Sequence, residues 1–309
     1  MNMIARHELW RMEYRKSRYM EFLSREELET RAKDVFCNLM ILSPKGQISL
    51  REMSQAGGYW IVIWTHVLEE FVIRYGPYPN GFTNGFIKDA DVVVPSYPQP
   101  LKSKVAIDVI GGAKSGHLYK FSRMEFLEDS YKFGRFRISA ASAYNDPSLN
   151  NAVRDDELSF VVSTRGEKIL YNYNNEAMQS YGRVDHKLTS NTNYYVACFA
   201  TNYTYREYDD FKADGCLVIK DARRFTAALL EAVSAQLTDY RCFASSVRYI
   251  DPLNSKLGDV DVFMAKHFRF SYQNEYRAVW VPNTDISVLE PVWVELGSME
   301  NYAELISLN

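Results

Sequence analysis

Gln273 and Glu275 stand two residues apart, just ahead of the apolar segment 278–281. On an extended strand, side chains at i and i+2 point to the same face. An amide and a carboxylate at the entrance of one strand could therefore grip a substrate through two polar contacts. The same spacing also fits a solvated strand edge on which Arg277 pairs with Glu275, and spacing alone leaves both interpretations open.

Three other segments carry polar or basic residues beside short apolar runs. Residues 117–123 read H-L-Y-K-F-S-R, and residues 136–139 read F-R-I-S and are followed by A-Y-N-D-P at 143–147. Between these and Gln273 lies Y-V-A-C-F-A at 195–200, which has the continuous apolar character of a buried strand. Asn145 and Asp146 could line a pocket, but Asn-Asp-Pro is equally a good turn signal.

Several other kinds of chemistry lack the residues that they need. Gly111-Gly112-Ala113-Lys114-Ser115 departs from the phosphate-binding loop G-x-x-x-x-G-K-[ST], and a loop leading into a strand is the better interpretation. The five histidines never stand at metal-ligand spacing and the four cysteines form no C-x-x-C, so we expect no metal. There is no G-x-S-x-G elbow of a serine hydrolase.

The elements that must position these residues predict an α+β fold. A capping box at Ser24–Glu27 opens a first helix, and two glycines before residue 59 and Gly76-Pro77 after it delimit a second over 59–75. Further helices are predicted over 222–236, with Asp221 as N-cap, and over 253–267. Short strands are predicted over 105–110, 117–121, 135–139, 158–163, 194–199, 216–219, 247–250 and 276–281. We place a helical N-terminal region with a proline-rich connector at 1–112 and a second domain at 113–309.

Composition excludes several classes of protein. With 36 basic and 39 acidic residues and a net charge of −3, the chain is no polycation for nucleic acid. No apolar run is long enough for a membrane span, and the charged N-terminus does not read as a signal peptide, so we expect a cytoplasmic protein without a membrane partner. The 22 tyrosines and 17 phenylalanines exceed what catalysis alone requires.

The order of these motifs resembles a known group of bacterial domains. Y-K-F at 119–121, Y-N-D-P at 144–147, C-F-A at 198–200 and Y-Q-N-E-Y-R at 272–277 are similar to the pattern of domains found among abortive-infection and phage-resistance proteins. That group in turn resembles the ADP-ribosyltransferases, which include DNA-targeting toxins and poly-ADP-ribose polymerases. The resemblance covers residues 115–285 and implies a split β-sheet core of the ADP-ribosyltransferase type.

The resemblance also implies roles for particular residues. The last transferase motif, [QE]-x-E, matches Gln273-Asn274-Glu275, so Glu275 would act on the ribose of NAD⁺ and Gln273 would orient the acceptor. Lys120 takes the position of the His or Arg that ends the first core strand, and would hold the adenosine or the pyrophosphate as a point charge. The remaining cofactor-binding residues implied are Tyr119, Phe121 and Tyr144, which could sandwich the nicotinamide, together with Arg123, Ser139 and Asn145. Ser139 and Tyr144 are the alternatives for the middle motif.

The function implied is the transfer of ADP-ribose from NAD⁺ to a macromolecular acceptor, in phage defence or a toxin–antitoxin system. An aromatic-rich surface suits stacking with splayed bases, which favours single-stranded nucleic acid over protein as acceptor. An antitoxin or a phage-derived trigger would restrain such an enzyme. Two other functions stay open: a catalytically inactive binding module, and a hydrolase that depletes NAD⁺.

Overall fold

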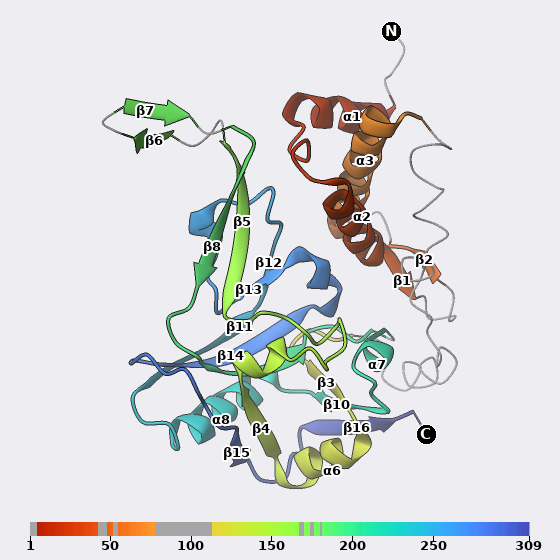
Figure 1. The fold of residues 1–309 in the computed structure, drawn as a ribbon. Helices are drawn as coiled ribbons and strands as arrows, with labels where there is room; N and C mark the ends of the chain where they lie inside the picture. The colour runs from red at the N-terminus through yellow and green to blue at the C-terminus, as the bar shows by residue number, and fades with distance from the viewer. Residues whose placement is uncertain are drawn as a thin grey trace.

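The computed structural model describes residues 5–42, 48–51, 55–77, 113–166, 170–173, 176–179, 181–204 and 206–308. The predicted α+β class is confirmed: a group of N-terminal helices precedes a mainly antiparallel sheet with its own helices (Figure 1). The predicted strand at 105–110 and most of the proline-rich connector lie outside the described residues. The predicted domain boundary falls at the end of that same segment.

The described residues of the N-terminal region form three helices and two short antiparallel strands. They are α1 (Arg6–Ser17), α2 (Arg25–Leu39), β1 (Met40–Leu42), β2 (Ile48–Leu50) and α3 (Gln55–Tyr75). The capping box predicted at the start of α2 is present, because Ser24 Oγ accepts from the Glu27 amide at 3.1 Å and Glu27 Oε2 accepts from the Ser24 amide at 2.7 Å. This pairing satisfies two backbone donors that the first helical turn leaves open.

Helix α3 ends where the sequence predicts but begins earlier. Gly76, at φ 86°, follows its last residue in the left-handed conformation that glycine favours. Gly57 and Gly58 lie inside the helix instead of before it, because α3 packs along α1 and α2 and tertiary packing outweighs the weak helix propensity of glycine. Within the described residues, no helix combines the length and the apolar character needed to cross a membrane.

The second part of the chain is built on one twisted sheet. Its strands run in the order β11-β14-β9-β3-β10-β16, and β4 joins it through β9 and carries β15. The bounds are β3 (Leu118–Ser122), β4 (Arg135–Ala140), β9 (Tyr195–Ala200), β10 (Gly215–Ile219), β11 (Tyr240–Ser246), β14 (Glu275–Pro282), β15 (Val292–Glu295) and β16 (Ala303–Ser307). All these pairings are antiparallel.

This sheet splits along one edge of β9. On its other edge β9 pairs with β14 over six residues, from Ala200 opposite Glu275 to Tyr195 opposite Trp280. On the split edge, β4 pairs with Tyr195 and Val196, and β3 pairs only through Tyr119 opposite Ala200. Residues 197–199 therefore have no strand partner on that side, and the two neighbouring strands diverge there.

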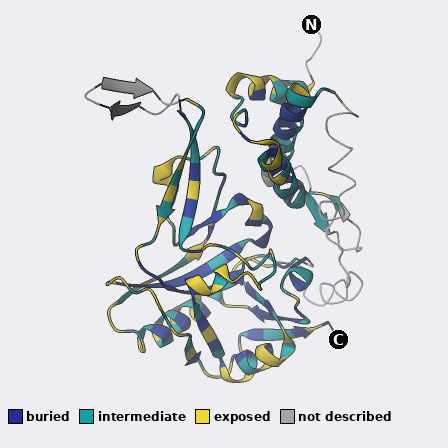
Figure 2. Cartoon of the chain, viewed as in Figure 1, coloured by how far each residue is buried: buried dark blue, intermediate teal, exposed yellow. Residues whose placement is uncertain are grey.

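Helices and aromatic clusters cover the sheet. Helix α8 (Ala222–Ser234), capped by Asp221 as predicted, buries Phe225 and Leu229 in a core with Phe199 and Trp280. On β3 the side chains alternate: Leu118 belongs to that core, whereas Tyr119 and Phe121 belong to another cluster, which contains Tyr203 and Tyr208 of the segment around α7 (Arg206–Asp210). Figure 2 shows the buried residues concentrated in the central strands and on the inner faces of the helices.

A long hairpin rises from the sheet beside the N-terminal helices (Figure 1). It is formed by β5 (Ser159–Arg165) and β8 (Arg183–Thr189), and the pair β6 (Leu170–Tyr173) and β7 (Glu176–Gln179) lies beyond it. Ion pairs link the hairpin to the helical region: Arg183 to Glu27 at 2.7 Å and Arg165 to Glu21 at 2.5 Å. The hairpin thus braces the two parts of the molecule.

A buried ion pair and an aromatic stack join the helical region to the sheet. Arg31 of α2 binds both carboxylate oxygens of Asp251 at 2.9 and 2.6 Å, and both residues are buried. Trp60 of α3 stacks on Phe268, with ring centroids 5.8 Å apart. Phe268 begins η4, a 3₁₀ helix over Phe268–Gln273 that leads directly into β14. The N-terminal helices therefore hold the segment that carries Gln273.

The helix predicted over 253–267 is wrong. This stretch contains a short 3₁₀ helix, η3 (Leu257–Asp259), and the strand β13 (Ala265–His267), which pairs in parallel with β12 (Arg248–Ile250). Aspartate side chains take the backbone donors that a helix would need: Asp251 accepts from the Leu253 amide and Asp261 from the Phe263 amide, both at 3.1 Å. Such local turns compete with the helix.

Several elements of the structure were not predicted from the sequence. They include helices α1, α6 (Met124–Phe133) and α7, and strands β1, β2, β6, β7, β8, β11, β15 and β16. The half-exposed strand β11 carries small and polar residues on both faces, so it lacks the alternation of a typical strand. The other strands predicted within the described residues agree with the structure to within one or two residues.

Gly134 gives a test of the turn between α6 and β4. It has a φ of 64°, and an added Cβ would meet the carbonyl oxygen of Gly297 and lie 2.8 Å from Leu296 Cβ. Gly182 has a φ of 81° but no heavy atom within 4 Å of such a Cβ. We expect Gly182→Ala to cost about 1–2 kcal/mol from backbone strain alone, and Gly134→Ala to cost about 1–3 kcal/mol more from the clash, measured by urea unfolding. Equal destabilisation of the two variants would contradict the close packing at Gly134.

Candidate functional site

A cavity of about 180 Å³ opens where β3 and β9 diverge. The segments that line it come from many parts of the sequence: β3, η1 (Ala141–Asn145) and the loop after it, the end of β9, the segment around α7, the strand β13, η4 and the start of β14. The lining residues are Tyr119, Lys120, Phe121, Tyr144, Ala152, Val153, Glu157, Cys198, Phe199, Ala200, Glu207, Phe211, Lys266, Gln273 and Glu275. The sheet split therefore produces a pocket that contains both carboxyl and amine groups.

The structure brings six of the predicted site residues to this cavity and leaves three outside its lining. Those that line it are Tyr119, Lys120, Phe121, Tyr144, Gln273 and Glu275. Arg123 is exposed at the start of α6 and pairs with Glu125 at 3.1 Å. Ser139 on β4 accepts a hydrogen bond from Arg137, and Asn145 is exposed at the end of η1. Nothing in their positions connects these three side chains to the cavity.

Glu275 belongs to a buried network of four charges. Its Oε1 accepts from Arg277 Nε at 2.7 Å and its Oε2 accepts from Lys266 Nζ at 2.6 Å. Arg277 also binds Glu157 through both terminal nitrogens, at 2.7 and 3.0 Å. All four side chains are at least 94% buried. The two cations and the two carboxylates give the network a net charge of zero. The charge-assisted hydrogen bonds between them offset the free-energy cost of removing the four charged groups from water.

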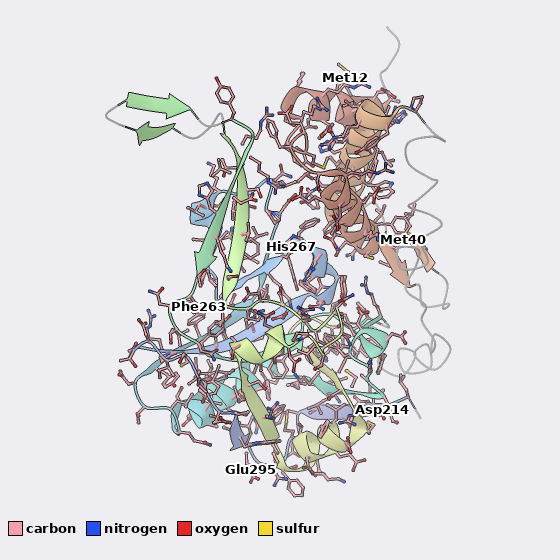
Figure 3. The ribbon with its side chains drawn as sticks, in the orientation of Figure 1. Met12, Met40, Asp214, Phe263, His267 and Glu295 are labelled. Carbon is pink, nitrogen blue, oxygen red and sulfur yellow. The ribbon has the colours of Figure 1, made fainter. Side chains whose placement is uncertain are left out.

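Arg277 pairs with Glu275, as the alternative interpretation of a strand edge predicted, but the pair is buried instead of solvated. It donates a further hydrogen bond to the carbonyl oxygen of Phe263, at 3.1 Å. Figure 3 labels Phe263 and His267, which bound the segment that contributes Lys266. Glu275 therefore does not lie on a solvated strand edge. It lies in the wall of the cavity, where Arg277 and Lys266 hold its two carboxylate oxygens.

The network sets the protonation of its members. Burial opposes the ionisation of Glu275, but the charges of Arg277 and Lys266 outweigh it and hold the pKa of this carboxyl well below its usual range. Burial likewise disfavours the charged form of Lys266, yet Glu275 and Glu157 raise its pKa. Glu275 is therefore a carboxylate at neutral pH, as an electrostatic role toward a cation requires.

Gln273 does not lie on the strand, so the predicted common strand face is wrong. It is the last residue of η4, and Asn274 follows in the left-handed conformation at φ 46° before β14 begins. Its amide is held by protein groups: Nε2 donates to the Ala152 carbonyl at 2.8 Å and Oε1 accepts from Lys266 at 3.1 Å. The turn still brings Gln273 and Glu275 together, because both bind the same ammonium group.

Lys120 has a different environment from Lys266. Its Nζ donates to the Cys198 carbonyl at 3.0 Å, across the gap in the sheet, and lies 5.4 Å from the centre of the Phe199 ring. No carboxylate among the described residues forms an ion pair with it. Burial lowers the pKa of Lys120, and an anion entering the cavity would favour its charged form.

The aromatic residues of β3 are packed rather than open. Tyr119 is fully buried, its hydroxyl accepts from the Lys114 amide at 2.9 Å, and its ring contacts Tyr203 edge-on. Phe121 packs against Tyr203 and Tyr208. Both rings belong to that buried cluster while also lining the cavity, and Tyr144, the third predicted aromatic residue, is partly exposed. Asp146 accepts a hydrogen bond from the Ser148 amide at 2.8 Å. Asn-Asp-Pro therefore forms a turn here, which is one of the two interpretations that the sequence left open.

Sequence reasoning missed Lys266 and Glu207 and gave Glu157 and Cys198 no role. Lys266 lay in a segment predicted as helix, so its place beside Glu275 could not be foreseen. Glu207 follows the aromatic segment at 203–205 in a polar stretch that carries no motif. Glu157 ends an acidic run, which by itself predicts a solvated turn.

Comparisons with known proteins find no counterpart: no family model, no curated protein and no solved structure matches this chain. The interpretation of the cavity therefore rests on its own residues.

Replacing Lys266 tests whether the network stabilises the fold. Lys266→Met removes one of the two cations that bind Glu275, and breaking a buried ion pair from one side costs about 3–5 kcal/mol. Lys132 provides the matched control, since it pairs with Glu128 at 3.0 Å on the surface, and Lys132→Met should cost less than about 1 kcal/mol. Denaturant unfolding of both variants measures the difference, and similar small losses would show that the network contributes little.

Proposed function

We propose that this protein is an ADP-ribosyltransferase that uses NAD⁺ as donor and a macromolecule as acceptor. The observation that carries the proposal is the juxtaposition, in one cavity at a split in the sheet, of a fixed carboxylate and an amine with no ion-pair partner among the described residues. A split sheet of this kind also agrees with the ADP-ribosyltransferase-like core that the sequence resemblance implies.

The reaction needs a fixed negative charge at the ribose. The bond between the ribose carbon and the nicotinamide nitrogen breaks, and its electron pair neutralises the pyridinium ring. The sugar is left with oxocarbenium character until a lone pair of the acceptor forms the new bond and the acceptor releases its proton. A carboxylate that is already ionised and held by Arg277 and Lys266 stabilises this charge without reorganising. That is the role proposed for Glu275.

A second cavity supplies room for the rest of the dinucleotide. Its volume is about 450 Å³, and it shares Lys120, Tyr144 and Phe199 with the first. Arg137 and Trp293, which face each other across β4 and β15, also line it. In the proposed complex the nicotinamide riboside lies near Glu275, the pyrophosphate near Lys120, and the adenosine in the second cavity.

An exposed surface beside the second cavity supports nucleic acid as the acceptor. Phe126, Phe133 and Trp293 are each about half exposed. Arg123 lies over Phe126, with 4.7 Å from guanidinium carbon to ring centre, and Arg135 lies over Phe133 at 5.6 Å. Unpaired bases can stack on such aromatic and guanidinium groups, whereas paired bases cannot reach them. We therefore propose single-stranded nucleic acid as the acceptor.

The environment of Gln273 favours one alternative function. Its amide nitrogen and oxygen are both bound by protein groups, so the amide is not left open to orient an acceptor. With water in place of the macromolecule, the same site would hydrolyse NAD⁺ to ADP-ribose and nicotinamide. The two functions differ only in the acceptor of the ADP-ribose, which is a macromolecule in one and water in the other.

Labelled NAD⁺ separates these possibilities, with Glu275→Gln as the test variant. Label should appear in a macromolecular fraction that nuclease dissolves and protease does not, and Glu275→Gln should reduce its transfer about 10²–10³-fold, the usual effect of losing one transition-state contact. Asp251→Asn is the matched control, because it also converts a buried, arginine-bound carboxylate to an amide but lies outside the cavity lining. Activity per folded molecule should survive in that variant.

Each other outcome has a definite meaning. Free ADP-ribose as the main product would assign the hydrolase function, and protease-sensitive label would assign a protein acceptor. Intact NAD⁺ after incubation with denatured single strands and with cell extract would reject enzymatic activity. Equal loss in Glu275→Gln and Asp251→Asn would mean that the loss reflects folding rather than chemistry.

Lys120→Met tests the proposed pyrophosphate contact. If the ammonium binds NAD⁺ equally in the ground state and the transition state, its loss should raise KM about tenfold or more and leave kcat unchanged. Steady-state kinetics with varied NAD⁺ measure both constants. A fall in kcat at constant KM would contradict the assignment.

A further inference from the structure

Glu207 is a second carboxyl of the cavity, in an environment opposite to that of Glu275. It lies in α7, is 1% exposed and lines the cavity. Its Oε1 accepts one long hydrogen bond, 3.3 Å, from the Thr204 hydroxyl. Its Oε2 is buried and has no hydrogen-bond partner among the described residues. A buried polar atom left in this way costs free energy unless a ligand supplies the partner.

The nearest cations, Arg206 and Lys266, form their ion pairs with carboxylates other than Glu207. Arg206 of the same helix binds Asp210 at 2.8 Å, donates to the Cys37 carbonyl at 2.9 Å and stacks on the ring of Tyr272. Lys266 is bound to Glu275 and Gln273. An ionised Glu207 would be a buried charge without a partner, which proteins avoid by keeping the proton.

The surroundings of Glu207 agree with a protonated side chain. Burial raises its pKa well above the usual range, and Asp210 adds to this, while Arg206 and Lys266 oppose it. The charged and titratable groups that influence it or are influenced by it are Arg206, Asp210, Cys216, Tyr249, Lys266 and Tyr272. The cavity therefore holds one ionised and one neutral carboxyl, a combination that divides acid and base roles in many active sites.

We propose that Glu207 donates a hydrogen bond from its buried carboxyl group to a neutral acceptor atom of the bound ligand, and that this atom is the carboxamide oxygen of nicotinamide. The identity of the ligand rests on the proposed function; the donor role rests on the geometry. A neutral donor suits a carboxamide because it satisfies the oxygen without bringing a second charge close to Glu275. It also selects against ligands that present a carboxylate at this point, since two carboxyl groups would then compete for one proton.

Infrared difference spectra test the donor role without requiring turnover. At neutral pH the wild-type protein should show the carbonyl stretch of a protonated carboxyl group that is missing from Glu207→Gln and retained in Asp209→Asn, a control that removes a neighbouring carboxyl which does not line the cavity. Saturating nicotinamide or benzamide, which share the carboxamide, should shift this band to lower frequency. Absence of the band, or a band that neither compound shifts, would overturn the proposal.

Kinetics give a second measurement that separates this inference from the proposed function. Glu207→Gln keeps an N–H donor and should retain near-normal KM for NAD⁺, whereas Glu207→Met lacks the donor and should raise KM about 3- to 10-fold, the value of one neutral hydrogen bond. Equal KM values in these two folded variants would contradict the donor role. If the ligand shifts the band but the protein never cleaves NAD⁺, the donor role of Glu207 stands and the proposed enzymatic function is rejected. If the protein cleaves NAD⁺ and needs Glu275 to do so, but the band is absent, the enzymatic function stands and the donor role is rejected.

Discussion

The ion pairs between Glu275, Arg277, Lys266 and Glu157 constrain the whole second part of the molecule. Four charges can stay buried only if each finds its partner at hydrogen-bonding distance. This requirement fixes β14 against the neighbouring strand β13 and against the loop that precedes β5, although that loop lies more than a hundred residues earlier in the sequence. The position of the cavity wall thus follows from electrostatic neutrality as much as from apolar packing.

The split in the sheet supplies the second condition for a site. Were β3 and β4 to pair with β9 along its full length, side chains and ladder hydrogen bonds would fill the space that the cavities occupy. Instead Lys120 reaches across the gap to the Cys198 carbonyl and satisfies a backbone group that lacks a strand partner there. One side chain therefore compensates for the missing ladder and also presents an amine to the cavity.

Local signals in the sequence predicted much of the fold but only part of the site. The capping box at Ser24 and the N-cap at Asp221 depend on residues three apart, so the sequence reveals them directly. Lys266 and Glu207 act through contacts that only the tertiary fold creates, and no periodicity marks them. Gln273 was placed near Glu275 for a wrong reason: a left-handed turn at Asn274, rather than a shared strand face, brings the two together.

The pairing of Arg31 with Asp251 spans 220 residues, and it bears on the order in which the chain becomes structured during synthesis. Contacts at such separation form late, because the intervening chain must be made and closed first. The N-terminal helices are synthesised long before the segment around Asp251 that packs against them. Glu157 is likewise synthesised well before its partner Arg277. A nascent chain that ends before β14 contains η4 but lacks Glu275 and Arg277, so the buried charge network cannot form in it. The wall of the cavity is therefore completed only when synthesis is nearly finished.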